Sequence, residues 1–173
     1  NEGIQIIYNE KEKDLPKLIF NAKKNEILLI YTPAISSDNT LLNFFRLKQI
    51  RIFKRAEILG LISKYLYTIA IAGTHGKTTT STMLAHILHH NRKDVVAFLG
   101  GISSNYNTNF LMSDKSDLMI VEADEFDRSF LHLHPDIAII TSISADHLDV
   151  YDDIDDLFLA FHQFASQVKN KGL

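Results

Sequence analysis

The sequence has 173 residues, 46% of them hydrophobic, which suits one domain or one and a part around a buried core. Its 18 basic and 21 acidic residues give a net charge of −3, so composition makes no electrostatic case for nucleic-acid binding. The absence of cysteine excludes disulfides and thiolate metal sites. The longest apolar runs are too short to span a bilayer and no signal peptide precedes them. We therefore expect a cytoplasmic protein without membrane insertion.

The first 65 residues predict short strands that alternate with helices. We expect strands at residues 3–8, 27–31 and 50–53, and helices at residues 15–24, 38–47 and 55–65. Asp38 is the expected N-cap of the second helix. Strands and helices that alternate at this spacing favour the α/β class, with parallel sheets flanked by helices.

The stretch from residue 68 to residue 90 predicts a strand, a tight glycine loop and a helix. The apolar run at residues 69–72 stops at Gly73, and apolar residues recur at helical spacing after Gly76. A glycine can adopt positive φ and lets the backbone approach a ligand closely. Backbone N–H groups at such a helix start, together with the helix dipole, form a site for phosphate.

Two side chains at the start of this helix have the chemistry of a nucleotide site. Lys77 can reach the β- and γ-phosphates, and the Thr78 hydroxyl can bind Mg²⁺. The predicted nucleotide-binding residues are Gly73, Thr74, His75, Gly76, Lys77, Thr78 and Thr79. The alternative is that the two glycines only punctuate a strand–helix turn, with the lysine solvated and the threonines capping the helix.

The loop is shorter than the usual P-loop pattern GxxxxGK[ST], because it reads GxxGKT. The segment GTHGKTTT closely resembles the ATP-binding loop of the Mur ligases. These are the ATP-dependent ligases of peptidoglycan precursor synthesis, so the resemblance implies a role in cell-wall biogenesis, cell shape and cell division. The pair Thr74-His75 resembles the loop sequence of the family branch that acts on UDP-N-acetylmuramate itself. The resemblance implies ATP and Mg²⁺ as cofactors.

The resemblance also implies a division of the chain into two domains. Residues 1–66 would form the second half of a Rossmann-like domain that binds the UDP moiety, and residues 67–173 the first part of the P-loop NTPase-like central domain. The segments YTPAI (31–35) and KRAEILGLI (54–62) resemble the first of these domains. Taken alone, YTPAI also fits a strand end followed by a proline turn. We expect an internal section of a longer enzyme, with little or no activity by itself.

A strand at residues 95–99 ends at Gly100-Gly101 and leads into the polar stretch ISSNYNTN. This stretch has no periodicity, so it fits a mobile surface loop. The resemblance offers a functional reading, because the corresponding loop of the family lies beside the muramoyl substrate. The residues alone leave both readings open.

Acidic residues follow the next predicted strand, at residues 117–121. Glu122 stands at its carboxyl end, where doubly wound sheets bind ligands, and carboxylates are the oxygen ligands that Mg²⁺ prefers. A solvated acidic loop is the alternative. Because VEADEFDRSFL resembles the EADE segment of the family, the resemblance makes Glu122 a metal ligand.

His147 lies after a further apolar strand at residues 137–141 and is flanked by Asp146 and Asp149. DHLDVY resembles the DHLD motif of the family, whose histidine is metal- or phosphate-proximal, so Lys77 and His147 become the implied catalytic residues and Thr78, Glu122 and His147 the implied metal ligands. One departure is Ser142, where the family usually has asparagine. The remaining histidines are expected to be structural or solvated: His75 apart, these are His86, His89, His90, His132, His134 and His162.

From Asp152 an acidic turn predicts the start of a helix with an apolar face formed by Leu157, Phe158, Phe161, Phe164 and Val168. Its acidic residues suit capping better than catalysis. The resemblance as a whole implies a ligase that joins L-alanine to the carboxylate of UDP-N-acetylmuramate through an acyl phosphate, releasing ADP and phosphate. Alternatives are the recycling ligase that attaches a tripeptide, a non-catalytic nucleotide-binding module, and a generic P-loop NTPase.

Overall fold

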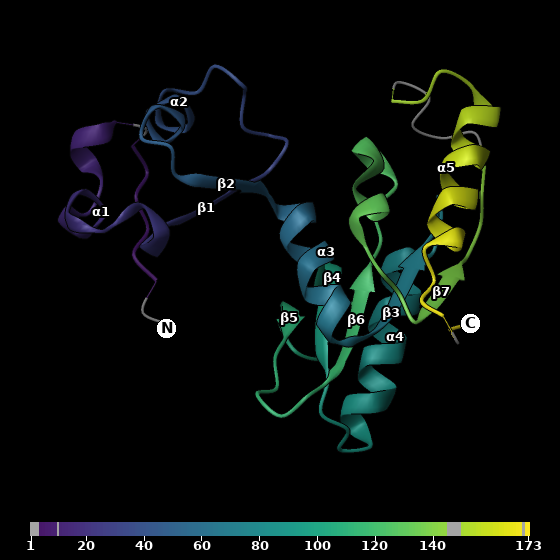
Figure 1. The fold of residues 1–173 in the computed structure, drawn as a ribbon. Helices are drawn as coiled ribbons and strands as arrows, with labels where there is room; N and C mark the ends of the chain where they lie inside the picture. The colour runs from purple at the N-terminus through teal and green to yellow at the C-terminus, as the bar shows by residue number, and fades with distance from the viewer. Residues whose placement is uncertain (1–3, 10, 145–149, 171) are drawn as a thin grey trace. The chain divides into compact units, whose positions relative to one another are not determined.

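The computed structural model describes residues 4–9, 11–144, 150–170 and 172–173, and Figure 1 shows its course as a ribbon. The chain divides into two compact units, Asn1–Ile58 and Leu59–Leu173. The predicted domain boundary lies a few residues further along, just after the helix α3 (Arg55–Tyr65). The assignment of the two domains stays a prediction.

The first unit contains a two-stranded parallel sheet. Strands β1 (Leu28–Tyr31) and β2 (Arg51–Lys54) pair residue by residue. The other elements are α1 (Lys17–Asn21), α2 (Thr40–Leu47) and the short 3₁₀ turns η1 (Glu12–Asp14) and η2 (Lys24–Glu26). The buried apolar residues of this unit are Leu42, Phe45 and Ile50.

The strand predicted at residues 3–8 is wrong for the described part, because residues 4–8 have no regular secondary structure. Ile4, Ile6 and Tyr8 are 71%, 68% and 90% exposed. A strand needs backbone partners on a neighbouring strand, and the described residues of this unit offer only the pair β1 and β2.

The cap of α2 also differs from the prediction. The Asn39 side chain accepts a hydrogen bond from the backbone N–H of Leu42, whereas Asp38 lies one residue too early. Asp38 instead accepts a hydrogen bond from the Ser36 hydroxyl, which lowers the pKa of the Asp38 carboxyl. Asn and Asp are equally good caps by type, so the sequence alone did not decide between these neighbours.

The second unit is built on a five-stranded sheet in the order β5-β4-β6-β3-β7. Its strands are β3 (Tyr67–Ala72), β4 (Val96–Ser103), β5 (Thr108–Leu111), β6 (Leu118–Glu122) and β7 (Ile137–Ile140). The last four strands in the sheet order are parallel to one another, while β5 is antiparallel to β4. The α/β class is confirmed, with β3 at an interior position between β6 and β7.

Helices cover both faces of this sheet (Figure 1). Successive strand residues point to opposite faces, so Ala70 and Val121 belong to one core cluster while Ile71 and Ile120 belong to the other. The first cluster packs against α5 (Ile154–Ser166) and the 3₁₀ segment η3 (Phe126–His132). The second cluster includes Ala85 of α4 (Lys77–His90). The strand, glycine loop and helix predicted from residue 68 to residue 90 are thereby confirmed.

Strand β5 was not predicted. The polar stretch after Gly100-Gly101 turns back as a hairpin, with β4 running on to Ser103 and Phe98 opposite Phe110. The two phenyl rings lie 4.9 Å apart between centroids. This single aromatic pair gives too little alternation to predict a strand, which explains why the sequence predicted a loop.

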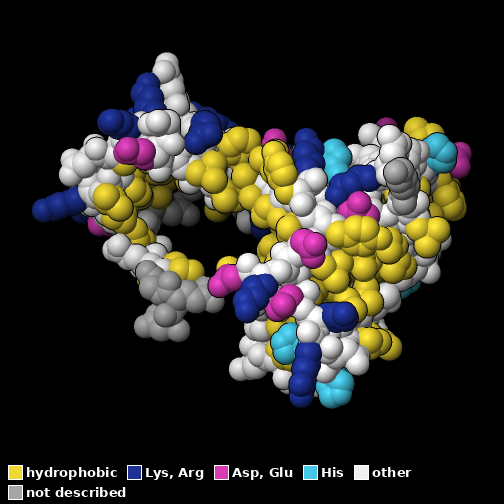
Figure 2. Space-filling model, turned by 60° about the horizontal axis from the view of Figure 1, so that its bottom comes forward, with side chains coloured by type: hydrophobic (Ala, Val, Ile, Leu, Met, Phe, Trp, Pro, Cys, Tyr) yellow, Lys and Arg dark blue, Asp and Glu magenta, His cyan; other side chains and the backbone are white. Residues whose placement is uncertain are grey.

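The face shown in Figure 2 carries interspersed basic and acidic side chains, in keeping with 18 basic and 21 acidic residues in the sequence. Large apolar side chains are also exposed, among them Leu47, Tyr65 and Ile102. Within the described ranges, none of the helices is both long enough and apolar enough to cross a bilayer.

Candidate nucleotide site

The site begins where β3 gives way to α4. The backbone φ is +131° at Gly73 and +83° at Gly76, conformations that glycine adopts without the steric cost of a Cβ atom. Gly76 is the N-cap of α4, and no side chain caps the helix there. The first N–H groups of a helix have no partner within it and carry the positive end of its dipole. This helix start therefore provides amide donors suited to an anion.

Residues that follow β7 hold the glycine loop in place. The Thr74 N–H donates to the Ser142 carbonyl (3.0 Å), and the Thr141 hydroxyl donates to the His75 carbonyl (2.5 Å). A Cβ atom at Gly73 would stand 2.2 Å from the Thr141 Oγ1, so the close approach of the two segments requires glycine. Thr74 itself is buried.

Ser142 has a role that the sequence did not predict. Its hydroxyl oxygen accepts a hydrogen bond from the His75 N–H at 3.1 Å. The serine that departs from the family pattern thus contacts the predicted nucleotide-binding loop directly. The His75 side chain is exposed, and its Nε2 lies 3.5 Å from the Ser144 hydroxyl.

Lys77 points back across the loop. Its Nζ donates to the Gly73 carbonyl at 2.7 Å and lies 3.0 and 2.8 Å from the two carboxylate oxygens of Glu125. The Glu125 side chain is fully buried and that of Lys77 is 13% exposed. Sequence reasoning missed Glu125, because it assigned the chemistry of EADE to the first glutamate alone.

Thr78 and Glu122, both predicted metal ligands, lie together. The Thr78 hydroxyl donates to Glu122 Oε1 at 3.0 Å, and the Gly100 N–H donates to Glu122 Oε2 at 2.8 Å. Glu122 ends β6, which lies between β3 and β4, so its carboxylate contacts Thr78 after β3 on one side and Gly100 of β4 on the other. A hydroxyl and a carboxylate that share one point form the oxygen donor set that suits Mg²⁺.

The remaining predicted residues fall into two groups. Thr79 lies in the first turn of α4 with an exposed side chain. His147, with Asp146 and Asp149, lies outside the described residues, so its assignment stays a prediction. Across the described part of the chain, no group of three His, Asp or Glu side chains is placed to hold a metal ion.

Side chains from η3, from the residues before α5 and from the first turn of α5 form a network next to Glu125. The Tyr151 hydroxyl donates to the Glu125 carbonyl at 2.6 Å, and Tyr151 is 2% exposed. Burial raises the pKa of Tyr151 to about 12. The Arg128 guanidinium lies over the Tyr151 ring, 4.9 Å from its centroid, and pairs with Asp156 at 2.5 Å. Tyr151, Arg128 and Asp156 thus form a connected network that reaches the main-chain carbonyl of Glu125.

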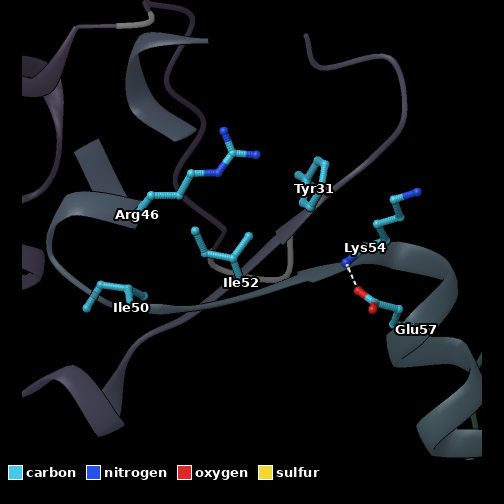
Figure 3. Close-up of a pocket in the computed structure, with 6 residues that line it drawn as sticks. All are labelled: Tyr31, Arg46, Ile50, Ile52, Lys54 and Glu57. Atoms are coloured by element: carbon cyan, nitrogen blue, oxygen red, sulfur yellow. Dashed lines mark hydrogen bonds between the residues drawn. The ribbon is translucent and has the colours of Figure 1, made fainter. Parts of the chain in front are cut away.

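The first unit has a hollow of its own, of about 480 Å³, shown in Figure 3. Tyr31 and Lys54 end the two parallel strands, and Arg46 reaches the hollow from α2. The residues around it are Tyr31, Arg46, Ile50, Ile52, Lys54 and Glu57. Tyr31 and Lys54 place one side of the hollow at the carboxyl ends of the strands, where open α/β sheets bind ligands, while Ile50 and Ile52 place the rest beside the start and middle of β2.

Comparison with known proteins gives one family. Residues 71–173 match the Mur ligase middle domain. The UDP-N-acetylmuramate–L-alanine ligase of Cytophaga hutchinsonii is 46% identical over 175 residues, which cover 99% of this chain and 37% of that protein. The chain thus spans little more than a third of the length of this relative.

Two solved structures have a similar fold. The UDP-N-acetylmuramate–alanine ligase of Thermotoga maritima has a TM-score of 0.72 and 32% identity, covering 81% of this chain and 33% of that one. The UDP-N-acetylmuramate:L-alanyl-γ-D-glutamyl-meso-diaminopimelate ligase of Neisseria meningitides has a TM-score of 0.73 and 22% identity, covering 83% and 50%. The latter supports the fold alone. The middle-domain match extends over more than half of the residues of this chain, and the chain therefore belongs to the Mur ligase family.

Proposed function

We propose that the protein joins L-alanine to the carboxylate of UDP-N-acetylmuramate, with ATP converted to ADP and phosphate. The observation that carries this proposal is the convergence of the uncapped start of α4, Lys77, Thr78 and Glu122 at one edge of the sheet. The choice of L-alanine is supported by the relative from Cytophaga hutchinsonii, which is named for that reaction.

ATP fits the site through its phosphates. The amides at the start of α4 and the Lys77 ammonium would spread the charge of the β- and γ-phosphates. Thr78 and Glu122 would hold Mg²⁺, and we propose His147 as a further metal ligand. When bound, Mg²⁺ draws the anionic phosphates and the substrate carboxylate together.

The proposed reaction has two steps. A carboxylate oxygen of UDP-N-acetylmuramate attacks the γ-phosphorus, the bond to ADP breaks, and an acyl phosphate forms. The amine of L-alanine then attacks the acyl carbon, phosphate leaves, and the amine loses a proton as the amide forms. Lys77 contributes position and charge rather than proton transfer, so we assign no general base.

The first unit suits the UDP part of the substrate. Arg46 of α2 and Lys54 of β2 place two cations around the hollow, and a diphosphate is a dianion or more. Arg46 is oriented by hydrogen bonds to the Ser37 carbonyl (2.7 Å) and the Asn43 side chain (3.0 Å). We propose residues 1–66 as the UDP-binding part and residues 67–173 as the ATP-binding part.

The proposed setting is the cytoplasmic stage of peptidoglycan precursor synthesis, with small molecules as partners. A part in peptidoglycan precursor synthesis would also give the protein a role in cell shape and division. Because the chain spans 37% of the length of its relative, we also propose that the 173-residue chain by itself has little ligase activity.

The test is product analysis with the complete protein. ATP, Mg²⁺ and UDP-N-acetylmuramate are supplied with either L-alanine or the tripeptide L-alanyl-γ-D-glutamyl-meso-diaminopimelate, and products are identified by mass spectrometry. We expect the L-alanyl product and ADP in equal amounts. Amide formation with the tripeptide alone would replace the proposal by the recycling reaction, and ATP binding without any product would leave a non-catalytic nucleotide-binding module.

A further inference from the structure

Lys77 has a competing partner inside the nucleotide site. An ammonium group has three N–H donors, and three oxygen atoms lie within 3.0 Å of Lys77 Nζ: the Gly73 carbonyl and both carboxylate oxygens of Glu125. A phosphate oxygen that binds this ammonium must therefore replace one of these contacts. The Glu125 carboxylate has the charge opposite to that of the ammonium. Among the three oxygen atoms, its two therefore compete most strongly with the phosphates for Lys77.

The burial of Glu125 shows that this contact is costly to build. Its side chain is fully buried, and a buried ion pair gains little net stability over an apolar pair of similar volume. A carboxylate at this position is therefore poorly explained by stability alone. Its placement against the lysine of the phosphate loop favours a role in the handling of the nucleotide.

The backbone around Glu125 is also arranged at a cost. Asp127 and Arg128, two and three residues further along, have φ of 52° and 59°, a region that non-glycine residues adopt with strain. The Tyr151 hydroxyl anchors the Glu125 carbonyl, while Arg128 pairs with Asp156 on α5. These contacts hold the backbone of residues 125–128 in place, and the Glu125 side chain faces Lys77.

We propose that Glu125 is a positioning residue of the nucleotide site, which holds the Lys77 ammonium before the nucleotide arrives and competes with the phosphates for it. This inference rests on the proposed function, since it presupposes that ATP binds at the start of α4. Glu125 keeps the lysine side chain ordered in the free site and weakens the binding of both ATP and ADP. The return of Lys77 to Glu125 then favours the release of ADP after each reaction.

The direction of the effect separates this role from a structural one. Glu125→Gln keeps the size of the side chain and removes its charge, so Lys77 becomes available to the phosphates. We expect the dissociation constants of both ATP and ADP to fall roughly tenfold, which corresponds to about 1.4 kcal/mol. A residue that only supports the fold would give the opposite result, with nucleotide binding weakened.

The experiment is calorimetric titration of the complete protein with ATP and with ADP, each in the presence of Mg²⁺. The variants are Glu125→Gln, Glu125→Asp and Glu125→Met, and circular dichroism checks their folding. Glu125→Asp keeps the charge and should bind close to wild type. Glu125→Met is a second uncharged variant, of similar length, for which we also expect tighter binding. A double-mutant cycle with Lys77→Met tests whether the effect acts through the lysine.

Each outcome decides the proposal. Tighter binding in the uncharged variants that vanishes in the Lys77→Met background supports it. Equal or weaker binding by a folded uncharged variant overturns it, as does tighter binding that persists without Lys77. Failure of both uncharged variants to fold also overturns it, because Glu125 would then serve stability. Absence of ATP binding by the wild-type protein is a separate result, which contradicts the proposed function itself.

Discussion

The Thr78 hydroxyl and the Glu122 carboxylate meet at 3.0 Å, although 44 positions separate them in the sequence. The first lies in the opening turn of α4 and the second at the carboxyl end of β6. The parallel pairing of β3 with β6, with Ile71 opposite Glu122, brings them to the same edge of the sheet. The parallel pairing of the strands thus brings two of the predicted metal ligands together.

Gly100 makes room for this carboxylate, which gives a first prediction. A Cβ atom at Gly100 would stand 2.2 Å from Glu122 Oε2, so Gly100→Ala should displace the Glu122 side chain from Thr78. The clash involves the end of a flexible side chain, so we expect stability to change by less than about 1 kcal/mol. The factor by which Mg²⁺ strengthens ATP binding should fall roughly tenfold or more.

Gly101→Ala is the matched control for this test. A Cβ atom there would meet the Thr78 Cγ2 at 3.4 Å, an ordinary van der Waals contact. ATP titrations at several Mg²⁺ concentrations compare the two variants. Equal behaviour of Gly100→Ala and Gly101→Ala would contradict the assignment of Glu122.

The two glycines of the loop should differ in their tolerance of alanine. Gly73→Ala places Cβ 2.2 Å from Thr141 Oγ1 and 2.9 Å from the Ser142 backbone, at a φ of +131°. We expect a loss of about 3 kcal/mol or more in the free energy of unfolding. In Gly76→Ala the Cβ atom would lie 3.7 Å from its nearest neighbour, the Thr141 Cβ. The loss of stability then comes mainly from the φ of +83° and is about 1–2 kcal/mol. Urea unfolding of both variants checks the order, and a larger loss at Gly76 would show that contacts with Thr141 do not constrain the loop.

Lys77→Ala should lower stability as well as nucleotide binding. It removes the ion-pair partner 2.8 Å from the buried Glu125 carboxylate, and breaking a buried pair from one side costs about 3 kcal/mol or more. The double variant Lys77→Ala/Glu125→Gln should recover much of this loss because the buried charge is gone. Urea unfolding of the two variants measures the recovery. If the single and double variants unfold alike, the pair does not have the energetic coupling inferred from its geometry.

Tyr151 gives a prediction for alkaline pH. Burial raises its pKa from 10.0 to about 12 in the folded protein. A raised folded-state pKa means that the neutral phenol stabilises the fold, so this contribution is complete below pH 10 and is lost as the pH rises to 12. Tyr151→Phe should therefore flatten the fall in stability between pH 10 and pH 12.

At neutral pH, Tyr151→Phe should cost about 1–2 kcal/mol, because the Glu125 carbonyl loses its hydroxyl donor. Tyr65→Phe is the control, since the Tyr65 side chain is 87% exposed. Urea unfolding from pH 8 to pH 12 compares the three proteins. Parallel pH profiles for wild type and Tyr151→Phe would show that the folded-state pKa of this tyrosine is not raised.

Buried parallel strands were the most predictable part of the fold. The apolar runs that became β3 and β6 are strongly apolar because most of their residues are buried between the layers on the two faces of the sheet. The glycine loop was predictable for a local reason, since Gly73 and Gly76 adopt positive φ where they were expected to. Thr78 and Glu122 were each predicted as metal ligands, and their direct contact follows because the neighbouring parallel strands β3 and β6 end at the same edge of the sheet.

Contacts made by the tertiary fold were not predictable. In the sequence Glu125 is one of several acidic residues, and only the fold buries its side chain against Lys77. Ser142 departs from the family pattern, and only the fold brings its hydroxyl to the His75 N–H. The hairpin strand β5 depends on pairing with β4 rather than on its own alternation.

The most direct test of the nucleotide site uses two substitutions at Thr78 in the complete protein, followed by L-alanine-dependent release of ADP. Thr78→Ser keeps the hydroxyl 3.0 Å from Glu122 Oε1, whereas Thr78→Val keeps the shape and removes the hydroxyl. We predict near wild-type release for serine and a loss of roughly a hundredfold or more for valine, because a metal-binding oxygen is gone. Equal rates for the serine and valine variants would contradict the claim that Thr78 and Glu122 form the metal-assisted ATP site of an L-alanine ligase.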